Sequence, residues 1–98
     1  MAKGFHDKKR CARVAAIFKT LAHPQRLLII CCLCQHELTV GELQLQCGAP
    51  QSVISQQLTR LRLEGIVTAR RTGTHVHYRI ANARLPELIQ NLEKMFHG

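Results

Sequence analysis

The chain has 98 residues, enough for one small domain, and carries 14 lysines and arginines against 6 acidic residues, a formal net charge of +8. This charge favours a polyanionic partner such as a nucleic acid, and no apolar run reaches the roughly 18 residues of a membrane span, so no membrane partner is expected. The 5 cysteines are an odd number in a chain without a secretion signal, which predicts reduced thiols and a cytoplasmic location.

Two helices are predicted in the first third of the chain, after a basic tail of residues 1 to about 7. The first helix extends to residue 21, with apolar residues at helical spacing: Val14, Ile17, Phe18 and Leu21. Pro24 suits the first position of a second helix, which extends to about His36. The centre of this second helix, LLIICCLC, is apolar on all sides, so we expect it in the middle of the core.

Residues 39–67 predict two further helices joined by a tight turn. Thr39 and Glu42 have the spacing of a capping box, which begins a short third helix, and the sequence CGA at 47–49 is the turn. Pro50 is expected as the first residue of the fourth helix. Two helices joined in this way, the second with a polar outer face, predict a helix-turn-helix whose second helix enters the major groove of DNA.

The fourth helix, which Gly65 is expected to end, has one apolar face and one polar face. Glutamine can contact adenine through two hydrogen bonds, serine can pair with several base edges, and valine can contact the methyl group of thymine. Arginines near the end of the helix are better suited to phosphates. The residues predicted to contact DNA are Gln51, Ser52, Val53, Ser55, Gln56, Gln57, Arg60 and Arg62.

A basic hairpin and a final helix complete the predicted fold. Residues 67–71 and 75–80 are two β segments around a turn, and they predict a wing that contacts DNA backbone or minor groove through Arg70, Arg71, Thr72 and His75. The last helix has an apolar stripe, which we expect either to dimerise together with the first helix or to pack on its own core. The predicted fold is mainly α with a small β-hairpin (α+β), a winged helix-turn-helix of order ααααββα in a single domain, residues 1–98.

Several stretches together make the chain resemble the ArsR/SmtB family of bacterial repressors over roughly residues 12–97. They are HPQRLLIICCL, ELTVGEL, SVISQQLTRLRLEGIV and the hairpin ending in VHYRI. The resemblance implies a winged helix-turn-helix homodimer that binds an operator and releases it when an effector binds or a thiol reacts. Ser55 and Gln56 match the Ser-Gln of the family's recognition helix, and Gln57 stands where the family commonly has histidine.

The resemblance also bears on the effector. Thr39 and Gly41 stand where arsenic and cadmium sensors of the family carry cysteines, and the ligand positions of the zinc and cobalt sensors are here Asn82, Arg84, Met95 and Gly98. No metal and no cofactor is therefore predicted at these two family sites. The chain is most similar to the branch that includes the haemolysin and biofilm regulators and the persulfide sensors. That branch pairs a cysteine in the second helix with one near the end of the last, and these positions are Cys31 and His97.

Three interpretations of the cysteines remain open. Cys31 and Cys34 lie one helical turn apart, and with Cys11 or His97 as a third ligand they could hold As(III), Cu(I) or Zn(II). Alternatively, Cys31 could react with a persulfide or peroxide and then pair with Cys11 or Cys34. Finally, buried cysteines can act simply as small hydrophobic residues, which is the prediction for Cys47 in the turn.

Together, these features predict a homodimeric repressor of double-stranded operator DNA that is released by thiol chemistry in the second helix. The predicted effector is a small reactive sulfur species, an oxidant or a metalloid. The alternatives are a constitutive DNA-binding or architectural protein without an effector, a metal-responsive repressor with a non-standard cysteine site, and an interaction module for RNA or another acidic partner. The sequence has no combination of nucleophile, base and oxyanion-stabilising groups, so an enzyme is not expected.

Overall fold

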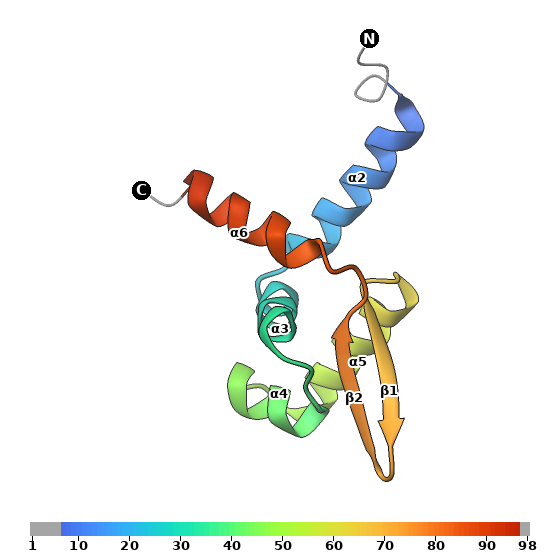
Figure 1. Ribbon diagram of the computed structural model, residues 1–98, viewed down its shortest axis with the longest axis vertical. Helices are drawn as coiled ribbons and strands as arrows, with labels where there is room; N and C mark the ends of the chain where they lie inside the picture. Colours follow the sequence, from blue (N-terminus) through green and yellow to red (C-terminus); the bar gives the residue numbers. More distant parts are fainter. Residues whose placement is uncertain (1–6, 97–98) are drawn as a thin grey trace.

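The computed structural model describes residues 7–96 and has the predicted winged helix-turn-helix order ααααββα (Figure 1). Most of the predicted basic tail, and His97, lie outside the described residues. The elements are α2 (Lys8–Leu21), α3 (Pro24–Gln35), α4 (Val40–Cys47), α5 (Gln51–Leu63), β1 (Val67–Thr72), β2 (His75–Ile80) and α6 (Leu85–Phe96).

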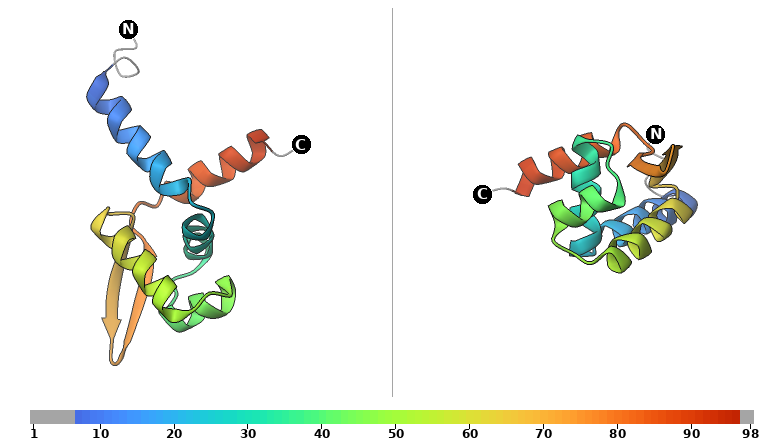
Figure 2. Two further views of the ribbon diagram at one scale, coloured as in Figure 1. Left: turned by 180° about the vertical axis from the view of Figure 1, so that it is seen from behind. Right: turned by 90° about the horizontal axis from the view of Figure 1, so that it is seen from below.

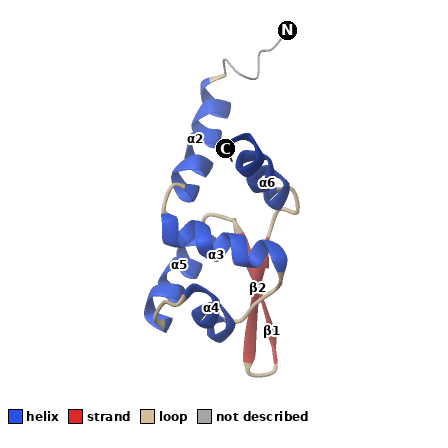
Figure 3. Cartoon of the chain, turned by 90° about the vertical axis from the view of Figure 1, so that its left-hand side faces the viewer, coloured by secondary structure: helices blue, strands red, loops and turns tan. Residues whose placement is uncertain are grey.

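Helix α3 is the centre of the structure, as its apolar sequence predicts. It begins at Pro24, where the missing backbone donor costs no helical hydrogen bond, and its C-cap is His36. Ile29 and Ile30 are fully buried, and α3 packs against α2, α4, β2 and α6. In Figure 3 it lies between the pair α2 and α6 on one side and α4 and the hairpin on the other.

Helix α4 and its turn follow the predicted capping chemistry. The Thr39 hydroxyl accepts a hydrogen bond from the Glu42 backbone at 3.2 Å, and the Glu42 carboxylate accepts one from the Thr39 backbone at 2.8 Å. Gly48 ends the helix with a φ of 64°, in the left-handed region that glycine enters without steric cost.

The prediction for Pro50 is wrong by one position. Pro50 is the N-cap of α5 and Gln51 is its first helical residue, because Pro50 has an extended ψ of 154°. Its carbonyl accepts the first hydrogen bonds of the helix, from the Val53 and Ile54 amides, both at 3.1 Å. The other end is as predicted, since Gly65 has a φ of 76° and follows the C-cap Glu64.

The two strands pair in an antiparallel hairpin from Val67 opposite Ile80 to Thr72 opposite His75. The first strand is therefore one residue longer than predicted, because Thr72 pairs instead of lying in the turn. Two backbone hydrogen bonds between Leu38 and Tyr78, at 3.0 and 2.8 Å, attach the hairpin to the segment before α4. This bridge fixes the wing beside the helix-turn-helix.

Helices α2 and α6 project away from the rest of the protein in two directions (Figures 1 and 2). Their apolar side chains are only partly covered: Val14 is 50% exposed, Phe18 49% and Phe96 80%. Leu21 and Leu85, where the two helices join the body, are buried. Within residues 7–96 no single helix is long and apolar enough to cross a membrane. Helices α2 and α3 reach the necessary length and apolar composition only when they are taken together, and the chain bends by 94° between them.

Candidate nucleic-acid interface and thiol sites

Helix α5 separates a buried face from an exposed polar face. Ile54, Leu58 and Leu61 are at most 1% exposed and fix the helix to the core. Of the predicted DNA-contacting residues, Val53, Ser55 and Gln57 are half-buried. The remaining ones on this helix are exposed: Gln51, Ser52, Gln56, Arg60 and Arg62. The structure therefore places the predicted residues on one helix with its apolar side anchored.

The side chain of Gln57 is held by a buried arginine that the sequence analysis did not single out. Arg26 on α3 is 7% exposed, and its Nε donates to Gln57 Oε1 at 3.0 Å. Its Nη1 donates to the Thr20 carbonyl at 3.3 Å. Because a guanidinium only donates, the Gln57 atom that it meets must be the oxygen. The amide NH₂ of Gln57 then remains to donate elsewhere.

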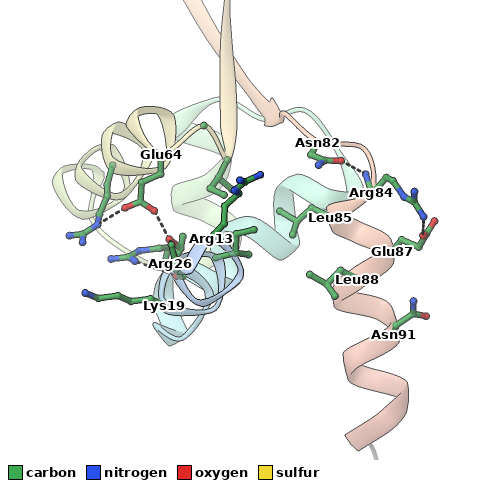
Figure 4. A pocket seen from close by; sticks show the side chains of 16 residues that line it. Arg13, Lys19, Arg26, Glu64, Asn82, Arg84, Leu85, Glu87, Leu88 and Asn91 are labelled. Atoms are coloured by element: carbon green, nitrogen blue, oxygen red, sulfur yellow. Dashed lines mark hydrogen bonds and ion pairs between the residues drawn. The ribbon is translucent and has the colours of Figure 1, made fainter. Parts of the chain in front are cut away.

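Glu64 connects the end of α5 to α2 (Figure 4). Its carboxylate accepts hydrogen bonds from the Thr20 hydroxyl and, at 3.1 Å, from Arg60 Nε. The Thr20 hydroxyl is the larger cause, and the Arg60 guanidinium a further one, of a Glu64 pKa below its ordinary value. Arg60, a predicted phosphate contact, thus has an acidic partner, although its side chain is 59% exposed.

These groups border a cleft of about 880 Å³ between α2, α5 and α6. Arg13 and Lys19 come to it from α2. Arg84 comes from the turn just before α6 and donates to Glu87 in the first turn of that helix at 3.3 Å (Figure 4).

The wing presents several basic side chains. Arg71 and His75 are exposed, and His75 lies beside His77, with ring centroids 6.5 Å apart. Arg70 pairs with Glu37 on the segment before α4, and it also donates to the Thr72 hydroxyl at 2.8 Å. Arg70 therefore helps to hold the wing against the body.

Cys31 and Cys34 open onto a cleft of about 820 Å³ between α2, α3 and α6. Burial, followed by the neighbouring Cys31 thiol, raises the pKa of Cys34 to about 11. Burial also raises the pKa of Cys31, with smaller contributions from Cys32 and Glu93. Since the thiolate is the nucleophile, a raised pKa lowers the fraction of each thiol that is in the reactive form at neutral pH.

The third predicted thiol, Cys11, is exposed in the first turn of α2. Among residues 7–96, no three His, Cys, Asp or Glu side chains are grouped to hold a metal ion. His97, the other predicted third ligand, lies outside the described residues.

Two thiols that were not paired in the sequence analysis, one on α3 and one on α4, are in contact. Cys32 Sγ and Cys47 Sγ are 3.9 Å apart, and both side chains are half-buried. Burial, followed by the neighbouring Cys32 thiol, raises the pKa of Cys47 to about 11. Cys47 was predicted from the sequence to be a packing residue. Its contact with Cys32 could not be predicted because 15 positions separate the two cysteines, and only the packing of α3 on α4 brings them together.

The fold and the polar face of α5 define a DNA-binding winged helix-turn-helix regulator. Residues 23–69 match the profile described as "Bacterial regulatory protein, arsR family". The chain is 43% identical over 89 residues to the biofilm growth-associated repressor of Xylella fastidiosa, covering 91% of this chain and 78% of the relative. It is 33% identical to the transcriptional activator HlyU of Vibrio cholerae, covering 91% of this chain and 82% of that protein. The protein belongs to the arsR family and is a transcriptional regulator, not an enzyme.

Solved structures agree with this assignment. The crystal structure of the transcriptional repressor BigR from Xylella fastidiosa matches with a TM-score of 0.86 and 41% identity, covering 98% of this chain and 97% of that one. The solution structure of a homodimeric winged helix-turn-helix domain, Mb0332 from Mycobacterium bovis, matches with a TM-score of 0.76 and 35% identity, covering 94% and 93%. The predicted family, and its branch of haemolysin and biofilm regulators, are confirmed.

Proposed function

We propose that the protein is a cytoplasmic, homodimeric repressor that binds double-stranded operator DNA through α5. The observation that carries this proposal is the exposed Ser/Gln face of α5, fixed to the core by three buried residues and followed directly by a basic wing. A helix held in this way can present its side chains to the major groove without rearranging. The net charge of +8 supplies attraction to phosphates of any sequence.

The two glutamines have different roles in this proposal. Gln56 is exposed, so its oxygen and NH₂ group can together contact one adenine. The Gln57 oxygen is already bound by Arg26, so Gln57 contributes its NH₂ group as a donor to an acceptor in the groove. Ser52, Val53 and Ser55 extend the base-reading set. Phosphate contacts come from Gln51, Arg60 and Arg62, and from the wing residues Arg70, Arg71, Thr72 and His75.

Dimerisation in this proposal uses the projecting helices α2 and α6. Their exposed apolar side chains form a surface that a monomer of this size would leave in water: Val14, Ile17, Phe18, Leu88, Met95 and Phe96. The similar Mb0332 domain is described as homodimeric. A second copy that covers this surface places two α5 helices on one DNA, and its operator then has two-fold related half-sites.

Release from the operator is assigned to thiol chemistry at Cys31, supported by its position in the cleft between α2 and α6. A persulfide, an oxidant or a metalloid bound there changes how the dimerising helices pack, with Cys34 or Cys11 as a second sulfur. The raised pKa values of Cys31 and Cys34 favour the alternative of a constitutive repressor. A Cys31→Ser protein distinguishes thiol-dependent release from constitutive binding. If variant and parent release DNA equally under a persulfide, an oxidant and a metalloid, the thiol mechanism is excluded.

Selection of duplexes from a random-sequence library tests the proposed DNA binding. The expected product is one motif with two-fold symmetry, bound by a dimer with an affinity that falls steeply as salt rises. Sedimentation measures the oligomeric state at the same protein concentration. Recovery of no motif, or of an asymmetric motif bound by a monomer, contradicts the proposal.

A further inference from the structure

Cys32 and Cys47 are two thiols from different helices in direct contact. Their sulfur atoms are 3.9 Å apart, and a disulfide requires about 2.05 Å, so bond formation needs the sulfurs to approach by about 1.9 Å. No bond joins them in the structure, where both are free thiols. Both are half-buried and therefore partly accessible to a small molecule.

The two cysteines differ in how easily they can move. Cys32 lies inside α3 between Ile29 and Leu33, which are 0% and 4% exposed, so its backbone is fixed by the core. Cys47 is the last residue of α4 and precedes Gly48, the left-handed C-cap. Because the end of a helix yields more readily than its middle, an approach of the sulfurs moves the end of α4 toward α3.

We propose that Cys32 and Cys47 are a site of oxidation by hydroperoxides, where the two thiols close to an intrachain disulfide. Cys32 is the attacking thiol, because the pKa of Cys47 is raised to about 11. Its thiolate attacks the peroxide oxygen, which forms an S–O bond, breaks the O–O bond and releases the alcohol, or water from hydrogen peroxide. The second sulfur then attacks the sulfenic sulfur, which forms the S–S bond and releases water. Two thiols and one hydroperoxide thus give one disulfide, one alcohol and one water.

This pair is separate from the cleft that holds Cys31 and Cys34. Those two thiols lie between α2, α3 and α6, whereas Cys32 and Cys47 lie between α3 and α4. Only three residues separate Cys47 from Gln51, the first residue of α5. The disulfide therefore shifts the start of the recognition helix, and its effect on operator affinity rests on the proposed DNA-binding function.

Peptide mapping tests the site without reference to DNA. After treatment with hydrogen peroxide and blocking of the remaining thiols, cleavage at Arg and Glu gives peptide 27–37, with Cys31, Cys32 and Cys34, and peptide 43–60, with Cys47. The expected product joins these two peptides with the loss of two hydrogens, from a protein that remains monomeric on denaturing gels. It disappears in Cys32→Ser and in Cys47→Ala, and it persists in the matched controls Cys31→Ser and Cys34→Ser.

Three results overturn the proposal: no cross-link in the parent, a cross-link that persists in Cys32→Ser, or a bond within peptide 27–37 alone. Circular dichroism checks that the variants are folded. If Cys32→Ser does not fold, the Cys31→Ser/Cys34→Ser protein decides, because Cys32 is then the only thiol in peptide 27–37 and a missing cross-link overturns the proposal. For the DNA effect, a Cys31→Ser/Cys34→Ser protein is oxidised and then reduced with dithiothreitol. Oxidation should weaken binding to the selected duplex about tenfold and reversibly.

If the disulfide forms and the affinity for the selected duplex does not change, the proposed effect of the disulfide on α5 is refuted. Failure of the reduced protein to bind any selected duplex refutes the proposed function instead, while the peptide map still decides the thiol site.

Discussion

The buried guanidinium of Arg26 gives the sharpest test of how the recognition helix is held. Arg26→Met keeps the length and apolar stem of the side chain and removes both of its hydrogen bonds, to Gln57 Oε1 at 3.0 Å and to the Thr20 carbonyl at 3.3 Å. A hydrogen bond with one charged partner contributes about 1.5–3 kcal/mol, and part of this is recovered when water reaches the half-buried Gln57. We therefore expect Arg26→Met to lower the free energy of unfolding by about 2–3 kcal/mol.

The same substitution should change base preference. Once Arg26 no longer binds its oxygen, the Gln57 amide can turn in the groove, and discrimination at one base pair of each half-site should weaken. Chemical denaturation measures the first effect, and binding to duplexes with single substitutions measures the second. Arg13→Met, an exposed residue of the same cleft, is the matched control. A stability within about 0.5 kcal/mol of the parent, typical of surface substitutions, together with unchanged preference would refute the assigned role of Arg26.

Three further predictions follow from single residues. The Glu64 pKa is lowered, so its hydrogen bond with Thr20 stabilises the fold above the ordinary pKa of glutamate, and this stabilisation is lost as pH falls through the lowered value. The stability of Glu64→Gln, measured across acidic pH, should therefore lack this part of the parent's loss. Identical stability-against-pH profiles of parent and variant would exclude the contribution. Gly48→Ala places a side chain at a φ of 64° and should cost about 1–2 kcal/mol in thermal unfolding, whereas an unchanged melting temperature would contradict the left-handed cap. The Cys34 pKa of about 11 predicts that iodoacetamide labels this thiol slowly at neutral pH and faster toward alkaline pH; labelling that is complete and pH-independent near neutrality would show a lower pKa.

Local chemistry predicted the helices and strands well because each carries its own signals. The Thr39–Glu42 capping box, the glycines at 48 and 65 and the two paired segments of the hairpin all have the structure that their sequence implies. Pro50 was misplaced by one residue because its fixed φ suits both the N-cap and the first helical position, and only ψ separates them.

Contacts between elements were less predictable. Arg26 and Gln57 are 31 residues apart, and Thr20 and Glu64 are 44 residues apart. A periodic pattern identifies the faces of each helix, but it does not give the angle and offset at which two helices pack. The sequence could therefore identify Gln57 as a polar residue on the reading face, while the engagement of its oxygen depends on the placement of α3 against α5.

The central claim is that the polar face of α5 reads bases, and Gln56→Ala tests it most directly because Gln56 is exposed and removal of its amide leaves the core intact. Binding of parent and variant is measured by fluorescence anisotropy on the selected duplex and on a scrambled duplex at the same salt concentration. Loss of one good contact of about 1–3 kcal/mol in each of the two half-sites sums to about 2–6 kcal/mol, which predicts roughly 30- to 20,000-fold weaker binding to the selected duplex, with little change on the scrambled one. Equal affinities of parent and variant for the selected duplex, or equal losses on both duplexes, would contradict the claim.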